Sequence, residues 1–324
     1  MFAVPALPPF DTALDLTLLA LVAVLLLLSS LSFAFVVHLR LKSRSAPHLG
    51  RFNSLWTVRL LLVSSTTLWA LVELLRVPFF RRRYIAPSLP FLTESQEAYL
   101  CKFHAVLSLG LCEPVFLLTA LFLVNVSIKK KDPRRLWALA FVFGVCLPLL
   151  VLQILFVFYQ PIDLLLPQVF GRSSYISKDE FGNDTVLCTY PLMSIIVFGV
   201  FGIAYSLCFF LSSCKVMSLV INKGLRTRIY LLAMAVLVSL PLEILLLVAS
   251  VMWMPDRAVY KGLVFGVFLC TLACTVAAEG ILVIRPIIDA LAAGGECCQW
   301  SPNQRPPPLE DDQRPQAEEI GVKV

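Results

Sequence analysis

Residues 16–37 read LTLLALVAVLLLLSSLSFAFVV, a run of 22 residues without a charged side chain. An α-helix rises about 1.5 Å per residue, so about 20 apolar residues cross a hydrocarbon core about 30 Å thick. Six further stretches of this kind follow along the chain. The predicted membrane-spanning helices are Leu16–Val37, Leu55–Leu75, Phe103–Ile128, Leu136–Tyr159, Tyr190–Leu211, Ile229–Trp253 and Gly262–Ile284.

Composition excludes the other fold classes. Hydrophobic residues make up 59% of the 324 residues and charged residues only 15%. A water-soluble domain needs a polar face on most helices, whereas these spans are apolar nearly all round. Strands of a membrane barrel would alternate in polarity over about ten residues, and the spans do not. The sequence predicts an all-α membrane protein, a seven-helix bundle over residues 16–284 after a short N-terminus at residues 1–15.

The distribution of Lys and Arg predicts the orientation in the membrane. If residues 1–15 lie outside, most of the basic residues fall on cytoplasmic segments, as membrane proteins generally require. We therefore expect an outer N-terminus and a cytoplasmic C-terminus, in the plasma membrane or an endomembrane. Arg76 and Arg81–Arg83 run against this trend. Basic residues confined to loops give no indication of nucleic-acid binding.

Several cytoplasmic features point to partners or lipid. Basic residues near the inner surface are candidates to contact an acidic cytoplasmic partner or anionic lipid: Lys129, Lys130, Lys131, Arg134, Arg135, Arg226 and Arg228. Residues 285–300 form a predicted juxtamembrane amphipathic segment, in which Cys297 and Cys298 are candidate lipidation sites. Residues 301–324 are Pro-rich and then acidic, which predicts a disordered cytoplasmic tail.

Two cysteines of the predicted outer side can form a disulfide. Cys101 lies at the outer mouth of the third span, and Cys188 lies at the end of the long loop before the fifth. An oxidising compartment would let a bond between them persist. Asn183-Asp184-Thr185, five residues before Cys188, is an N-glycosylation acceptor in the same loop.

Charged side chains within the spans are the strongest candidates for function, because each is costly in hydrocarbon. Arg59 and Glu279 lie at similar depth near the cytoplasmic end and predict an ion pair between the second and seventh helices. Such a pair would either bias a conformational state or merely fix helix register. Glu73 precedes Arg76 by three residues, which predicts a salt bridge within one helix.

Glu113 and Glu243 both lie near mid-membrane, each close to a proline, Pro114 or Pro241. A proline frees a backbone carbonyl and weakens the helix, so both positions are candidate hinges. The two acids could face a polar cavity, bind a cationic ligand or carry a proton. Alternatively, each is a protonated carboxyl bonded to the freed backbone.

The topology resembles that of G-protein-coupled receptors, but the local motifs of the rhodopsin-like class are missing. The third span ends Val124-Asn125-Val126-Ser127 without an acidic–Arg pair, and the seventh ends without Asn-Pro-x-x-Tyr. Residues 52–59 (FNSLWTVR), 100–104 (LCKFH), 109–114 (LGLCEP) and 125–127 (NVS) are together similar to an uncharacterised group of plant seven-helix membrane proteins. The resemblance covers most of the membrane domain. It implies a receptor-like orphan and supplies neither ligand nor catalytic residues.

Three functions remain open at this point. The first is a receptor-like protein that senses a small ligand or proton in a cavity near the third and sixth helices and signals through its basic cytoplasmic loops. The second is a transporter or channel for a small solute or ion, and the third is a membrane scaffold for cytosolic partners. No pattern of a catalytic, nucleotide-binding or metal site occurs, so we expect neither enzymatic activity nor a cofactor.

Overall fold

The computed structural model describes residues 9–45, 55–81, 94–126, 135–159, 173–178, 184–220 and 222–289. Seven of its helical segments are long and apolar enough to cross a membrane, which confirms the predicted number of spans. They are Ala13–Leu41, Trp56–Arg76, Ser95–Val126, Trp137–Phe158, Leu192–Leu219, Lys223–Val251 and Ala258–Asp289. The protein is a membrane-embedded helical bundle.

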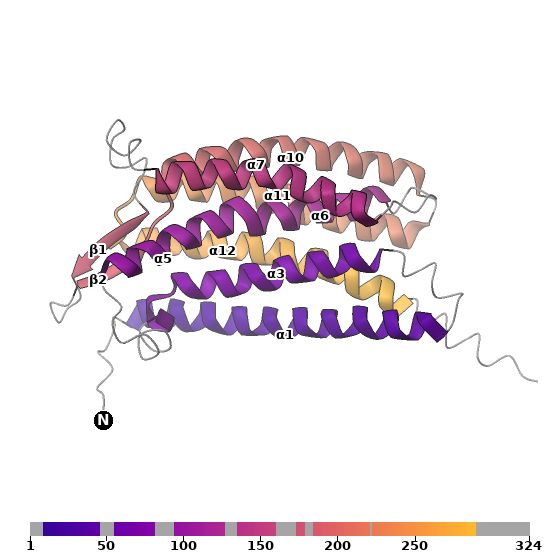
Figure 1. Cartoon of the computed structure of the whole chain (residues 1–324), viewed down its shortest axis with the longest axis horizontal. Helices are drawn as coiled ribbons and strands as arrows, with labels where there is room; N and C mark the ends of the chain where they lie inside the picture. Colours follow the sequence, from indigo (N-terminus) through magenta and orange to yellow (C-terminus); the bar gives the residue numbers. More distant parts are fainter. Residues whose placement is uncertain are drawn as a thin grey trace, which may run out of the picture.

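The helices lie side by side and alternate in direction along the chain (Figure 1). They are α1 (Pro9–Ser45), α3 (Trp56–Arg76), α4 (Pro78–Phe80), α5 (Glu94–Leu107), α6 (Glu113–Val126), α7 (Arg135–Phe158), α10 (Leu192–Leu219), α11 (Lys223–Val251) and α12 (Ala258–Ala278). Among the described residues, the third and seventh spans each contain a π-helical segment, η2 (Ser108–Cys112) between α5 and α6, and η3 (Glu279–Ile284) after α12. The third span is therefore α5, η2 and α6 together, and the seventh is α12 with η3.

Several spans extend beyond the predicted limits. The third begins at Ser95, so Cys101 lies inside the helix instead of at its mouth. The sixth begins at Lys223, where the Asn222 side chain accepts a hydrogen bond from the Gly224 N–H (2.9 Å) and caps the helix. The seventh continues past Pro286 to Asp289, into the predicted juxtamembrane segment. A polar cap or charged turn can thus extend a helix beyond its apolar core.

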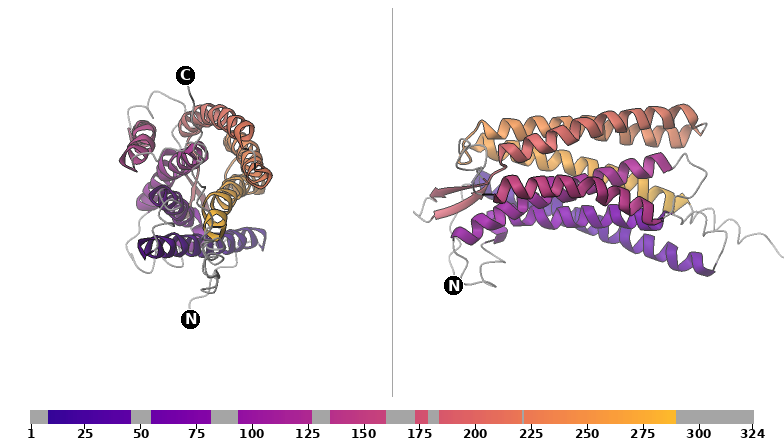
Figure 2. Two further views of the ribbon diagram at one scale, coloured as in Figure 1. Left: turned by 90° about the vertical axis from the view of Figure 1, so that its right-hand side faces the viewer. Right: turned by 45° about the horizontal axis from the view of Figure 1, so that its top comes forward.

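The third span lies at the centre of the bundle. In its most apolar window 89% of the residues are buried, against 22% in α7 and 28% in α1. Helices α3, α7 and α10 all pack against α6, and the end-on view shows the remaining helices grouped around this core (Figure 2). Side chains of the third span consequently meet those of most other helices, which makes this span the natural carrier of a buried site.

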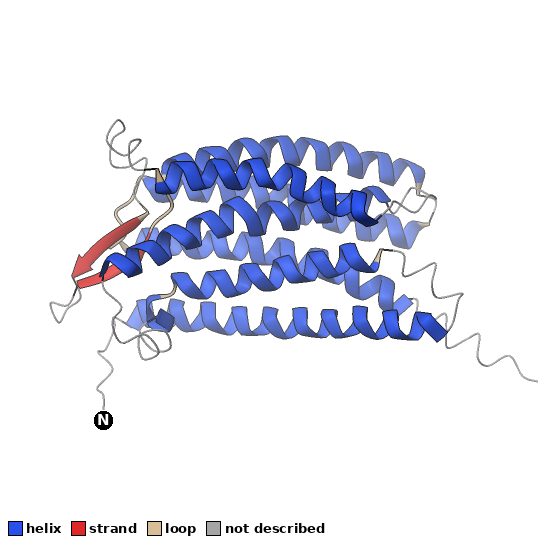
Figure 3. Ribbon diagram, in the orientation of Figure 1, coloured by secondary structure: helices blue, strands red, loops and turns tan. Residues whose placement is uncertain are grey.

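A two-stranded antiparallel hairpin, absent from the sequence predictions, lies in the loop between α7 and α10 (Figure 3). Strand β1 (Ser174–Lys178) pairs with β2 (Asp184–Cys188), and Ser174 lies opposite Cys188. The predicted disulfide between Cys101 and Cys188 is confirmed, with a Cα–Cα distance of 5.0 Å. It attaches β2 to α5. We call the end of the bundle that carries this hairpin the hairpin end.

A close contact links three helices near η2. A Cβ atom on Gly110 would lie 3.1 Å from Cγ of Gln153 in α7, so the absence of a side chain lets Gln153 press against the π segment. The Gln153 Nε2 group donates a hydrogen bond to the Ser194 carbonyl of α10 (3.0 Å). One buried amide therefore connects the third, fourth and fifth spans.

The disulfide closes a segment with a sequence separation of 87, so its loss frees a long loop in the unfolded chain. We expect Cys101→Ser to lower the free energy of unfolding by about 2–4 kcal/mol. Thermal unfolding of the purified protein in lipid nanodiscs measures this change. Cys208→Ser, at an exposed free thiol on α10, is the matched control and should leave stability unchanged. Equal stability of the two variants would show that the bond does not stabilise the fold.

Candidate functional site

The centre of the bundle holds a network of buried polar side chains, contributed mainly by α3, the third span and α11. Its acidic members are Glu73, Glu113 and Glu243, each no more than 4% exposed. Such a concentration is unusual, because carboxyl groups are costly to bury in an apolar bundle. The network divides into a carboxyl pair at the middle of the bundle and an ion-paired triad nearer the hairpin end.

The π-helical segment η2 positions the first acid. A π-helix bonds each N–H to the carbonyl five residues back, and here the Glu113 N–H donates to the Ser108 carbonyl. Side chains five residues apart therefore lie together, and Ser108 Oγ donates to Glu113 Oε1 (2.9 Å). Pro114 lacks an N–H and crowds the preceding turn, which gives a physical reason for the widened helix just before it. A regular α-helix would not align these two residues.

Glu113 of α6 and Glu243 of α11 form the carboxyl pair. Their carboxyl groups approach closely enough to share a hydrogen bond. Among the described residues, Glu113 Oε2 and Glu243 Oε1 are buried without a hydrogen-bond partner of normal geometry, and the Trp69 indole and the Thr271 hydroxyl lie near Glu113 and Glu243, respectively. Two ionised carboxylates can only accept, so the pair needs a proton, or another cation, between them. The sequence predicted that both acids lie near mid-membrane, and in the structure they are neighbours.

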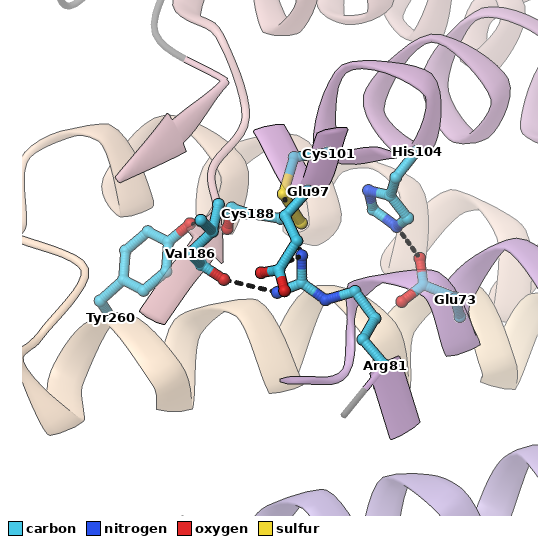
Figure 4. Close-up of a disulfide and its surroundings, with 8 residues drawn as sticks. All are labelled: Glu73, Arg81, Glu97, Cys101, His104, Val186, Cys188 and Tyr260. Carbon is cyan, nitrogen blue, oxygen red and sulfur yellow. Dashed lines mark hydrogen bonds and ion pairs between the residues drawn. A yellow bond between two sulfur atoms is a disulfide. The ribbon is translucent and has the colours of Figure 1, made fainter. Parts of the chain in front are cut away.

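The triad consists of Glu73, Arg76 and His104. Arg76 Nη2 lies 3.1 Å from Glu73 Oε2, which confirms the predicted salt bridge between residues i and i+3. On the other side, His104 Nε2–H donates to Glu73 Oε1 (3.2 Å), as Figure 4 shows. All three side chains are buried, so the salt bridge lies inside the bundle and not at its surface. The triad joins α3 to α5.

Arg81 holds the hairpin against the disulfide at the hairpin end (Figure 4). Its Nη2 donates to the Val186 carbonyl of β2, and its Nη1 lies 3.6 Å from Cys101 Sγ. Tyr260 of α12 donates its hydroxyl hydrogen to the Cys188 carbonyl (3.2 Å). Strand β2 is thus attached to both α5 and α12, beside the triad (Figure 4).

The predicted ion pair between Arg59 and Glu279 is not formed. Glu279 accepts hydrogen bonds from Ser29 and Ser32 of α1 instead. Among the described residues, no acidic side chain lies within ion-pair distance of Arg59, whose Nε is buried without a partner. Equal depth in the membrane was not enough to predict the Arg59–Glu279 pair. Depth does not determine how each helix is rotated about its axis, nor how the π-helical turn η3 changes the direction of the Glu279 side chain.

The remaining predicted residues have different outcomes. Arg228 forms an ion pair with Asp289 and so links the beginning of the sixth span to the end of the seventh. Arg226 is exposed. Pro241 lies inside α11, which continues through it without interruption. Asn183, Lys129–Lys131, Arg134, Cys297, Cys298 and residues 301–324 lie outside the described residues, as does the side chain of Arg135.

Sequence reasoning missed the role of His104 and of the α1 serines. His104 appeared isolated because its partner is 31 residues away, on another helix. Its four-residue spacing from Ser108 was the available signal, since it places both on one helical face. Within the described residues, no group of three or more His, Cys, Asp or Glu side chains could hold a metal ion.

The fold and its buried acids define a polytopic α-helical membrane protein with a central carboxyl network. A family model described as Uncharacterised conserved protein UCP031277 matches residues 8–297. This match covers most of the chain, which therefore belongs to that family. A comparison with curated proteins gives no match.

Removing the acid at the centre of the triad tests its structural importance. We expect Glu73→Gln to lower the free energy of unfolding by about 3–5 kcal/mol, because it leaves the buried Arg76 guanidinium without its counter-ion. Glu97→Gln is the control. Glu97 is partly exposed and 3.8 Å from Arg81, so its removal should cost less than about 1 kcal/mol. Thermal or denaturant unfolding compares the two, and a Glu73 variant as stable as the Glu97 variant would contradict the assignment.

Proposed function

We propose that this protein is a receptor-like membrane sensor whose Glu113–Glu243 pair responds to a proton or a small cationic ligand. The proposal assigns it no enzymatic activity. It also places the hairpin end outside the cell or in the lumen of an endomembrane compartment, with the C-terminus in the cytoplasm. The similarity to plant seven-helix proteins of receptor-like topology agrees with this reading.

The single observation that supports the proposal is the approach of two carboxyl groups from the third and sixth spans. Each group has one buried oxygen without a hydrogen-bond partner of normal geometry among the described residues, although the Trp69 indole lies near Glu113 and the Thr271 hydroxyl near Glu243. A shared proton attracts the two groups, whereas two ionised carboxylates at such short range repel each other strongly in an apolar medium. A change in protonation, or the arrival of a cation, thus alters the force between α6 and α11.

Both helices contain a feature that could convert this force into movement. Glu113 directly follows η2 and precedes Pro114, and Glu243 lies two residues after Pro241 in α11. Prolines and π turns weaken the local hydrogen-bond ladder, so bending concentrates there. Helix α11 begins at Lys223, next to Arg226 and Arg228, so its displacement would reorganise basic residues proposed to contact a cytoplasmic partner or anionic lipid.

A transporter is the second candidate, because titratable groups follow one another from the hairpin end to mid-bundle. Glu73 and His104 hydrogen-bond near the hairpin, and His104 shares a helical face with Ser108, which donates to Glu113. Such a series could pass protons as well as sense them. Proteoliposomes with an imposed pH gradient distinguish the candidates. Dissipation of the gradient by the wild type that is lost in Glu243→Gln favours transport, and an intact gradient favours sensing.

The sensor proposal predicts that the conformation of the inner loops depends on pH through the carboxyl pair. In nanodiscs, the protection of backbone amides from hydrogen exchange at the connection between α10 and α11, measured relative to the intrinsic exchange rate at each pH, should change between mildly acidic and mildly alkaline buffer. The double variant Glu113→Gln, Glu243→Gln should lose this change, because a glutamine side chain does not ionise in this pH range. Glu97→Gln, at a partly exposed acid outside the pair, should keep it. A wild-type response in the double variant would contradict the proposal.

The proposed orientation has its own test. Epitope tags at the two ends of the chain, probed before and after permeabilisation of the membrane, should be reached from opposite sides, the N-terminal tag from outside. A tag inserted in the loop that precedes β1 should behave like the N-terminal tag. Detection of both termini from one side would overturn the topology.

A further inference from the structure

Arg59 carries a positive charge that the sensor proposal does not use. It is the fourth residue of α3, which begins at the end of the bundle opposite the hairpin (Figure 1). Its Nε is buried without a hydrogen-bond partner, and among the described residues no acidic side chain lies within ion-pair distance of it. The side chain as a whole is partly exposed, so a group outside the bundle can reach it.

This charge cannot be removed by proton transfer. A buried carboxyl becomes neutral when it takes up a proton, whereas an arginine side chain in a protein keeps its charge and all five of its N–H donors. A donor buried without an acceptor is unfavourable, and more so when the group is charged. Arg59 therefore requires an acceptor that also carries negative charge.

A second guanidinium lies on the same side of α3. Arg40 of α1 places its Cζ atom 5.0 Å from the centroid of the Trp56 ring. Trp56 and Arg59 are three residues apart in one helix, so they share a helical face. The positive charges of Arg40 and Arg59 are thereby brought to one region between α1 and α3.

The first turn of α3 adds to this positive potential. Its N-cap residue is Leu55, whose side chain cannot cap the helix, and the turn contains no acidic residue. The N-terminal end of a helix carries a partial positive charge from its aligned peptide dipoles. Two guanidinium groups and this helix end repel one another unless an anion lies among them. The region thus has the electrostatics of an anion site.

The depth of the site favours a lipid as the source of the anion. Tryptophan is typical of the interface between hydrocarbon and water, and the partly exposed Trp56 is the first residue of α3. Arg59 lies three residues further along the helix, about 4.5 Å deeper. A long arginine side chain at this depth extends to the headgroup level. Lipid phosphates lie there, and a phosphate accepts two parallel N–H bonds from one guanidinium.

We propose that Arg59 and Arg40 form a binding site for the phosphate group of an anionic lipid. Arg59 donates Nε–H and one Nη–H to two phosphate oxygens, and Arg40 supplies a second positive charge from α1. The lipid joins the first span to the second at the end opposite the hairpin, which is the cytoplasmic leaflet in the orientation proposed above. Neither Glu113 nor Glu243 belongs to this site, so it does not depend on the sensor.

Thermal unfolding in nanodiscs of two compositions tests the site. One contains phosphatidylcholine alone, and the other also contains phosphatidylglycerol, whose only charge is its phosphate. The anionic lipid is expected to raise the Tm of the wild type by roughly 2–5 °C. Inorganic phosphate added to the phosphatidylcholine nanodiscs should leave the Tm unchanged. A Tm raised by inorganic phosphate and not by phosphatidylglycerol would overturn the proposal in favour of a soluble anion.

Substitutions separate this site from general attraction of a basic protein to anionic lipid. Arg59→Gln should abolish the Tm difference between the two compositions, and Arg59→Lys should retain part of it, because lysine keeps the charge without the planar fork. Arg285→Gln is the matched control, since Arg285 is exposed at the same end of the bundle, on the seventh span. It should respond to phosphatidylglycerol as the wild type does. An equal response of the Arg59→Gln variant would overturn the proposal.

The stability of Arg59→Gln without anionic lipid gives a further test. Because Arg59 has no partner among the described residues, this variant should be at least as stable as the wild type in phosphatidylcholine alone. A large and equal loss of stability in both compositions would show that Arg59 pairs with an acid of the chain itself, and would overturn the lipid site. Native mass spectrometry gives a measurement that does not require Arg59→Gln to fold. The wild type should retain a bound phosphatidylglycerol, and Arg40→Gln should retain less; equal retention would contradict the site.

Discussion

A buried acid in a bundle surrounded by hydrocarbon needs its partners inside the protein, and this requirement organises much of the interior. Glu73 meets a guanidinium and an imidazole, Glu113 meets a hydroxyl and a second carboxyl, and Glu279 meets two hydroxyls. These three solutions differ in how completely they neutralise the acid. Only the first supplies a formal positive charge from the chain itself. The other two acids meet no formal positive charge among the described residues, and of these two we assign a sensing function to Glu113 with its partner Glu243.

The π-helical segments η2 and η3 share an arrangement that sets the direction of two buried acids. Each contains a glycine, Gly110 or Gly280, and each ends two residues before a proline, Pro114 or Pro286. Proline removes a backbone donor and crowds the preceding turn, while glycine tolerates the altered geometry. A glutamate stands at one boundary of each segment, so the wider turn sets its direction. Sequence patterns that encode bends in helices therefore also encode the placement of the buried acids.

The number of spans was predictable from the sequence because a long apolar run has few alternatives in a membrane protein. The disulfide was predictable too, since Cys101 and Cys188 both flank predicted spans on one side. The partners of the acids were harder to predict. The Glu73–Arg76 bridge is local and was found, whereas His104, Ser29 and Ser32 required the rotation of separate helices to be known. The Arg59–Glu279 prediction failed for the same reason. The β1–β2 hairpin was missed because two five-residue strands give little periodic signal.

The contact between Gly110 and Gln153 makes the packing of α7 and α10 depend on the geometry of η2. Gln153 fits against a backbone without a side chain and holds the Ser194 carbonyl of α10 with its amide. If the π turn tightened into a regular α-helix, the Gly110 backbone would rotate and its fit with the amide would be lost. The conformation of the η2 turn is thereby coupled to the position of the fifth span through the uncharged side chain of Gln153.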